Sequence, residues 1–108
     1  MSVLQNAQAH YKSQLAGGLL SVEVPEWETT VYFKAAATFA QQAKIIELTN
    51  KGDLVEAMVE TLLQRALTED GKKMFTFADR AILLNQVDPE VIVRVVTAIN
   101  TTKAEVGN

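Results

Sequence analysis

Side chains that could transfer a proton or hold a metal are few in this sequence and lie far apart. The chain contains a single histidine, His10, and no cysteine, which excludes thiol catalysis and thiolate metal ligands. A general base needs a positioned partner, and no carboxylate stands near His10 in the N-terminal stretch. We therefore interpret His10 as a solvated helix residue rather than as a catalytic one.

Paired carboxylates occur at Glu69-Asp70 and at Asp88 with Glu90. Both pairs stand where a helix is expected to begin or end, and acidic residues at such places cap helices and form turns. Because this structural role accounts for them, neither pair is interpreted as a catalytic acid and base.

A calcium loop is the remaining metal site to consider, because an Asp-Gly pair lies within "ALTEDGKKMFTF". If Gly71 takes the place of the invariant glycine of an EF-hand, Ala66 and Phe77 take the first and last ligand places. Neither has a side-chain oxygen. Gly17-Gly18 lacks the later glycine and the lysine of a phosphate-binding loop. We expect no enzymatic activity, no metal and no cofactor.

Length and composition indicate one folded domain spanning residues 1–108. The chain has 108 residues, of which 48% are hydrophobic and 21% charged, as in ordinary globular proteins. Its net charge is −3 and its basic residues are scattered, so nucleic acid and anionic membranes are not expected partners. The sequence shows neither a membrane-spanning apolar run nor a secretory signal, and we expect a soluble, intracellular protein.

The N-terminal third predicts a helix followed by a hairpin. Residues 1–18 form a helix that could fray, with apolar residues on one face and Gly17-Gly18 as its stop. Residues 19–34 then alternate polar and apolar side chains, which predicts an antiparallel β-hairpin with Pro25 at its turn. The apolar residues of the helix face are Leu4, Ala7, Tyr11 and Leu15.

Residues 35–100 predict a helical core. The segment 35–50 has a stripe of Phe39, Ala43 and Ile46, and Asp53 precedes a central helix whose apolar face begins at Leu54 and Val55. An Asp-Gly turn, a short helix starting near residue 76 and a last helix from residue 89 follow, and residues 101–108 are expected to be a loose tail. The predicted fold class is mainly α, a compact bundle of about four to five helices with a small N-terminal antiparallel β-hairpin (α+β).

The aromatic residues of "SVEVPEWETTVYFK" are the candidates for binding a partner. A tryptophan in a polar turn either folds back on the core as a structural staple or stays exposed as an anchor for another protein. Both alternatives are open for Trp27, the only tryptophan of the chain, and the same choice applies to Tyr32 and Phe33. Taken singly, each is more typical of a core residue than of a contact.

Two short motifs, in this order and at this spacing, carry a resemblance to a known family. An N-terminal helix, "VPEW" at the hairpin, a central helix and then "TEDGKKMF" are similar to the tail assembly chaperones of long-tailed (siphovirus-type) bacteriophages and prophages. Thr68 stands where that family often has an acidic residue, and Glu28 where it often has glycine, which leaves the turn type open. The matching residues are Val24, Pro25, Glu26, Trp27, Glu69, Asp70, Gly71, Lys72 and Phe75.

This resemblance implies a non-enzymatic assembly factor that acts in the cytoplasm of the bacterial host and is absent from the mature virion. Its partners would be the tape measure protein, which it would keep soluble, and the tail tube protein, whose subunits it would recruit. Self-association is possible. The alternative is a small helical adaptor or regulatory domain that binds a protein partner as a homodimer, and gene order would separate the two.

Overall fold

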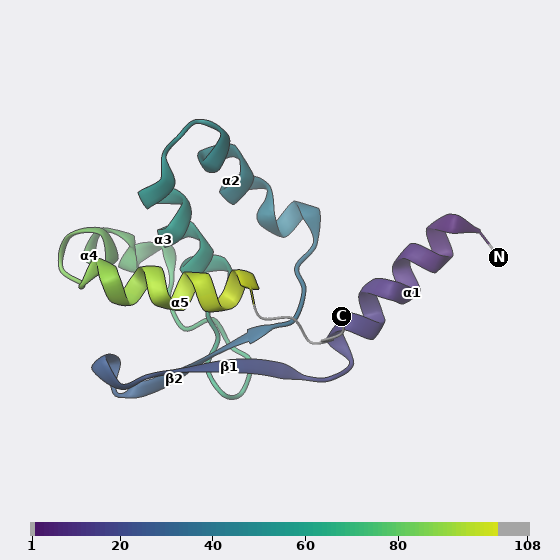
Figure 1. Cartoon of the computed structure of the whole chain (residues 1–108), viewed down its shortest axis with the longest axis horizontal. Helices are drawn as coiled ribbons and strands as arrows, with labels where there is room; N and C mark the ends of the chain where they lie inside the picture. Colours follow the sequence, from purple (N-terminus) through teal and green to yellow (C-terminus); the bar gives the residue numbers. More distant parts are fainter. Residues whose placement is uncertain (1, 102–108) are drawn as a thin grey trace.

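The computed structural model describes residues 2–101, and within them the chain is mainly helical with one antiparallel strand pair (Figure 1). The predicted fold class is thereby confirmed. The elements are α1 (Val3–Leu15), β1 (Leu19–Val24), η1 (Pro25–Trp27), β2 (Thr29–Lys34), α2 (Phe39–Asn50), α3 (Leu54–Arg65), η2 (Phe77–Asp79), α4 (Arg80–Asn85) and α5 (Pro89–Thr101). Apart from Thr101, which ends α5, the tail predicted to be loose lies outside the described residues.

The hairpin register sends apolar side chains to one face and polar side chains to the other. On the inner face Leu20 lies opposite Phe33 and Val22 opposite Val31, which is the alternation that a half-buried antiparallel pair requires. The strands are joined by the 3-10 turn η1, and Glu28 closes that turn with a left-handed φ of 55°. Glycine adopts this conformation without cost, which explains why glycine suits this place of the motif.

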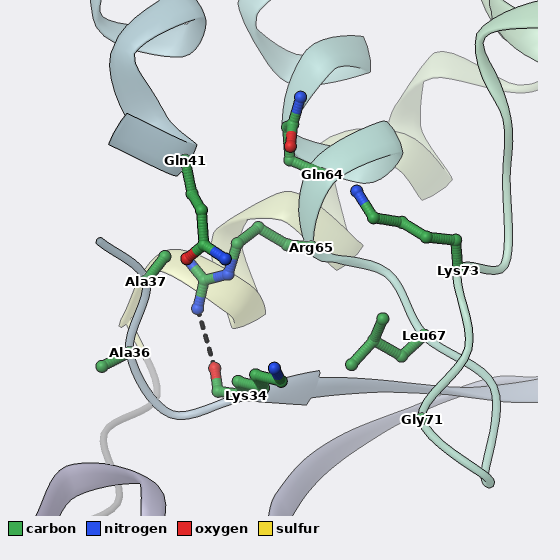
Figure 2. A pocket seen from close by; sticks show the side chains of 9 residues that line it. All are labelled: Lys34, Ala36, Ala37, Gln41, Gln64, Arg65, Leu67, Gly71 and Lys73. Carbon is green, nitrogen blue, oxygen red and sulfur yellow. Dashed lines mark hydrogen bonds between the residues drawn. The ribbon is translucent and has the colours of Figure 1, made fainter. Parts of the chain in front are cut away.

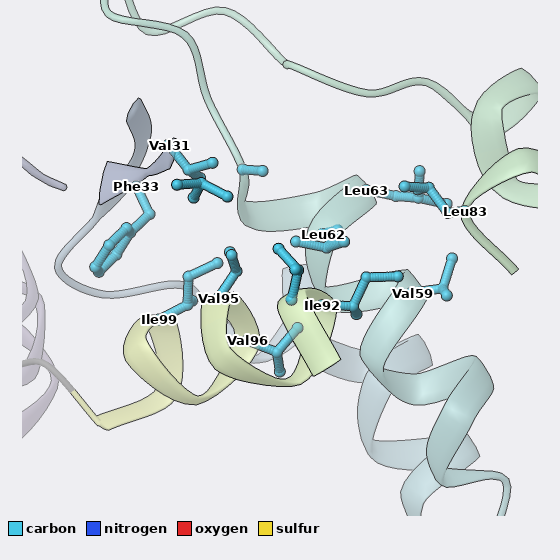
Figure 3. Close-up of a cluster of buried hydrophobic side chains, with 13 residues drawn as sticks. Val31, Phe33, Val59, Leu62, Leu63, Leu83, Ile92, Val95, Val96 and Ile99 are labelled. Carbon is cyan, nitrogen blue, oxygen red and sulfur yellow. The ribbon is translucent and has the colours of Figure 1, made fainter. Parts of the chain in front are cut away.

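The core forms where α5 and α3 cover the inner face of the hairpin (Figure 3). Helix α5 is rich in β-branched residues, which form helices poorly in isolation, so its helical state depends on burial. One cluster joins residues of the hairpin, α3, α4 and α5. Its members are Val24, Val31, Phe33, Val59, Leu62, Leu63, Ala66, Leu83, Val91, Ile92, Val95, Val96 and Ile99.

Helix α1 projects away from the rest of the molecule (Figure 1) and contains no buried residue. Its N-terminus is fixed by a capping box, in which Ser2 and Gln5 each accept a hydrogen bond from the other's backbone N–H. The predicted apolar face does not reach the core: Leu4 is 71% exposed, while Tyr11 and Leu15 are half-buried. The helix is thus set by local capping rather than by packing.

The helix predicted within residues 35–50 differs from the structure in its start and in the face that is buried. Helix α2 begins at Phe39, because Thr38 and Gln41 form a capping box at that point. Phe39 is 80% exposed and Ala43 is also exposed, whereas Leu48 is the buried residue of this helix. The helix therefore presents its C-terminal half, not its start, to the neighbouring α3.

The start of α3 also differs from the prediction. Asp53 precedes the helix, but its side chain makes no capping hydrogen bond. Leu54 and Val55 are 54% and 65% exposed, and burial on this helix begins at Ala57. The first turn thus extends beyond the core, and the helix becomes the predicted spine only from its second turn onward.

The segment after α3 folds back on the hairpin. Leu67 pairs with Tyr32 on one side and with Lys73 on the other, in isolated antiparallel bridges. Thr76 then caps η2 with Asp79 as its reciprocal partner, and the Asp88 carboxylate accepts a hydrogen bond from Glu90 N–H at the start of α5. The predicted short helix and the Asp-Pro helix start are both present.

Candidate partner-binding surface

The two sequence motifs, separated by two helices in the chain, are in direct contact. The Trp27 and Phe75 rings pack edge to face, with centroids 6.0 Å apart and planes at 84°. Such geometry places the positive edge of one ring against the negative face of the other. Trp27 is half-buried and packs against the core cluster, so it is chiefly a staple that holds the hairpin turn to the segment after α3.

A pair of backbone hydrogen bonds makes a second link between the motifs. Tyr32 N–H donates to Leu67 C=O at 3.0 Å, and Leu67 N–H donates to Tyr32 C=O at 2.7 Å. The segment that leads into the "TEDGK" turn is therefore attached to the outer edge of β2. Leu67 thus adds a single paired residue to the edge of the sheet, which otherwise consists of β1 and β2 among the described residues.

The "TEDGK" turn is closed by its own backbone and side chains. Thr68 N–H donates to Lys72 C=O at 2.8 Å, and Gly71 N–H donates to Thr68 C=O at 2.9 Å. Gly71 has a φ of 84°, a conformation that glycine adopts freely. The Thr68 hydroxyl donates a hydrogen bond to the Asp70 carboxylate. Thr68 therefore contributes to closing the turn with its side chain.

Glu26 connects the hairpin turn to α5 through a two-pronged ion pair with Arg94. The Arg94 guanidinium donates to both carboxylate oxygens, at 2.6 and 2.8 Å. These hydrogen bonds are the main reason that the pKa of Glu26 is lowered from 4.5 to about 2. Both side chains are exposed, so the pair orients the turn rather than forming part of the core.

The structure separates the three aromatic candidates. Phe33 is fully buried in the core cluster, because the strand register directs its side chain inward. It is therefore not accessible to a partner. Tyr32 lies on the outer face opposite Ser21 and is half-buried. Of the three, Tyr32 is thus the aromatic side chain on the face of the hairpin that the core does not cover.

A basic pocket beside the end of β2 was not anticipated from the sequence (Figure 2). It has a volume of about 160 Å³, and Lys34, Arg65 and Lys73 are among its lining residues. The Arg65 guanidinium donates to Lys34 C=O at 2.8 Å, and burial lowers the pKa of Arg65. The three cations come from three separate segments, so no spacing in the sequence could have revealed them as a group.

Within residues 2–101 no group of three or more histidine or acidic side chains is arranged to hold a metal ion. No helix in that same part of the chain combines the length and apolar character needed to cross a membrane.

Sequence comparison matches the chain to no protein-family model and to no curated protein. Comparison of structures does find a match, the tail assembly chaperone of bacteriophage HK97. The TM-score is 0.65 at 18% sequence identity, and the alignment covers 96% of this chain and 99% of the other. This chain thus shares its fold with that phage tail assembly chaperone over nearly its whole length, in agreement with the resemblance of the motifs.

Proposed function

We propose that this protein is a tail assembly chaperone that binds the tape measure protein and recruits tail tube subunits to it during tail morphogenesis. The observation that carries the proposal is the fold shared with the HK97 chaperone across 96% of the chain. The contact between the "VPEW" and "TEDGKKMF" segments supports it, because both family motifs then belong to one surface. The proposed site of action is the host cytoplasm, before the virion is complete.

The surface fits a protein that holds apolar segments of others. Large apolar side chains are exposed on several elements of the described chain, where a protein partner could reach them. They come from α1, α2, α3, η2, α4 and α5. These residues are Val3, Leu4, Phe39, Leu54, Val55, Phe77, Ile82 and Val93.

Within this role we assign the partner contact to the outer face of the hairpin. Tyr32 offers a half-buried ring there, whereas Trp27 packs against Phe75 and the core. Aromatic rings provide large contact areas at low cost in side-chain entropy, and they dominate binding energy at many interfaces. Tyr32 is the cleaner site to test, since substituting Trp27 would also weaken the fold.

The test is co-expression with the tape measure protein encoded by the same phage or prophage. Wild-type protein should raise the soluble fraction of the tape measure protein and co-purify with it, and tube protein should join the complex. Tyr32→Thr keeps a strand-forming residue and should reduce both readouts. Thr97→Ala, at an exposed polar position of α5, serves as the control and should leave them unchanged.

Two results would count against the proposal. If folded wild-type protein leaves the tape measure protein insoluble and captures neither partner, the homodimeric adaptor becomes the better interpretation, and light scattering would then test for the dimer. If Tyr32→Thr and Thr97→Ala behave alike while wild type is active, the chaperone role stands and the assignment of the hairpin face is wrong.

A further inference from the structure

Three positively charged side chains gather at the pocket at the end of β2. Lys34, Arg65 and Lys73 line it, and no acidic residue lines it. Among residues 2–101, none of the three lies within 4.0 Å of a carboxylate, although four other ion pairs occur on the surface. In a chain of net charge −3, this local excess of positive charge is a distinct feature.

Two of these cations are held in place rather than free in solvent. Arg65 Nη2 donates to Lys34 C=O at 2.8 Å, and Lys73 Nζ donates to Leu63 C=O at 3.1 Å. Each group keeps further N–H donors for a ligand, because a guanidinium has five and an ammonium three. Burial lowers the pKa of Arg65, which indicates a charge partly removed from water, and an anion beside it would offset that loss.

The remaining lining residues define the shape of the ligand. Gln41 and Gln64 are among the lining residues; Figure 2 shows Gln41 beside the Arg65 guanidinium, while the Gln64 amide donates to Glu60. Ala36, Ala37 and Leu67 supply apolar walls. The pocket thus combines cationic, amide and apolar lining groups.

We propose that this pocket binds the carboxylate of an acidic side chain presented by a protein partner. The planar guanidinium of Arg65 matches a carboxylate in shape and charge, and the alanine and leucine walls suit the methylene groups of glutamate. Inorganic phosphate is the other source of an oxyanion, but it has no apolar stem for those walls. The inference rests on the proposed function, since a chaperone must bring a protein segment to its surface.

The experiment is a titration of the ¹⁵N-labelled full-length protein with an N-acetylated, C-amidated oligoglutamate peptide, followed by amide chemical shifts at low ionic strength. The matching oligoglutamine peptide and inorganic phosphate are titrated in parallel. We expect saturable shifts on amides around the pocket, such as those of Ala36, Ala37 and Gly71, with oligoglutamate alone. The shifts should weaken as salt is raised, since the ion pairs are partly open to solvent.

Lys73→Gln and Lys72→Gln form a matched pair of variants. They remove the same charge from neighbouring residues, but only Lys73 lines the pocket. Lys73→Gln should weaken oligoglutamate binding by about two- to fivefold, the range for a partly exposed ion pair, and Lys72→Gln should not. Lys34→Gln, on an exposed side chain, gives the same test should Lys73→Gln disturb the fold.

Several outcomes would overturn the inference. Shifts spread over all basic residues, equal losses in the two lysine variants, or no saturable shift would each show that the pocket does not select a carboxylate. Equal binding of phosphate would show a general anion site and remove the protein side chain as its source. Because the titration contains no tape measure protein, its failure is distinguishable from a failure of the proposed chaperone function.

Discussion

The edge of one aromatic ring meets the face of another where Trp27 of the hairpin turn contacts Phe75, with 6.0 Å between the ring centroids. This contact joins a turn near the N-terminus to a segment beyond α3. It lies beside the core cluster, against which both rings are packed. The pair therefore acts as a stability element that can be measured separately from partner binding.

Trp27→Ala should lower the free energy of unfolding by about 2 kcal/mol, because it removes a large, half-buried side chain. A double-mutant cycle with Phe75→Leu should give a coupling energy of about 0.5–1.5 kcal/mol, the range for aromatic pairs. Urea unfolding measures both the loss of stability and the coupling energy. It is followed by far-UV circular dichroism, because Trp27→Ala removes the only tryptophan and so its fluorescence cannot serve as the signal. Strict additivity of the two single substitutions would contradict the contact.

The Glu26–Arg94 ion pair should make stability depend on pH. The pKa of Glu26 is about 2 in the folded protein, against an ordinary value of 4.5, so folding favours the charged carboxylate. The stabilisation is complete above about pH 4.5 and is lost as the pH falls through about 2. Glu26→Gln should therefore be less stable than wild type at neutral pH, and the difference should shrink across this window.

Urea unfolding of both proteins over this pH range is the measurement, repeated at high salt. The difference should be small and should diminish with salt, since both side chains are exposed. A difference that stayed constant down to pH 2 would assign the effect of the substitution to something other than the charge.

Gly71 and Gly17 should respond in opposite ways to alanine. A Cβ at either position would meet no atom within 4 Å, so only backbone conformation distinguishes them. Gly71 has a φ of 84°, and Gly71→Ala should cost about 1–2 kcal/mol of stability. Gly17 has no positive φ, and Gly17→Ala should be neutral or stabilise by up to about 1 kcal/mol. Thermal unfolding of the two variants checks this contrast, and equal effects would refute it.

Helix α1 should exchange its amide hydrogens long before the core does. It contains no buried residue, and an isolated helix of this length is marginal in water. Hydrogen exchange by NMR should show fast exchange in α1 and the slowest exchange in α3 and α5. Protection of α1 that rises with protein concentration would instead indicate that copies of the chain cover it.

The alternation of residues 19–34 and the long apolar faces of α3 and α5 made the fold class predictable from the sequence. The helix stripe at Phe39 was mispredicted because periodicity shows that a face is apolar but not whether another element covers it. The same reason explains Leu54 and Val55, which continue the apolar face of α3 beyond the core. Helix boundaries followed the capping residues, such as Thr38, more closely than the apolar pattern.

The candidate surface was predictable only where one segment carries it. Trp27 and Tyr32 stand in a single hairpin, so both could be named from the sequence. Whether Phe33 faces the core depends on the strand register, because a shift of one residue would move its side chain to the other face. The basic pocket depends on tertiary contacts among β2, α3 and the turn after it, and no local pattern encodes such a meeting.

The reciprocal hydrogen bonds between Tyr32 and Leu67 also leave the hairpin with two unlike edges. On β2, the outward backbone groups at the middle of the strand are already used, which blocks the addition of another strand there. On β1, the register turns the N–H and C=O groups of Ser21 and Glu23 outward, and no third strand pairs with them among the described residues. Any partner that bound as an extended strand would therefore have to approach β1, the edge away from the basic pocket.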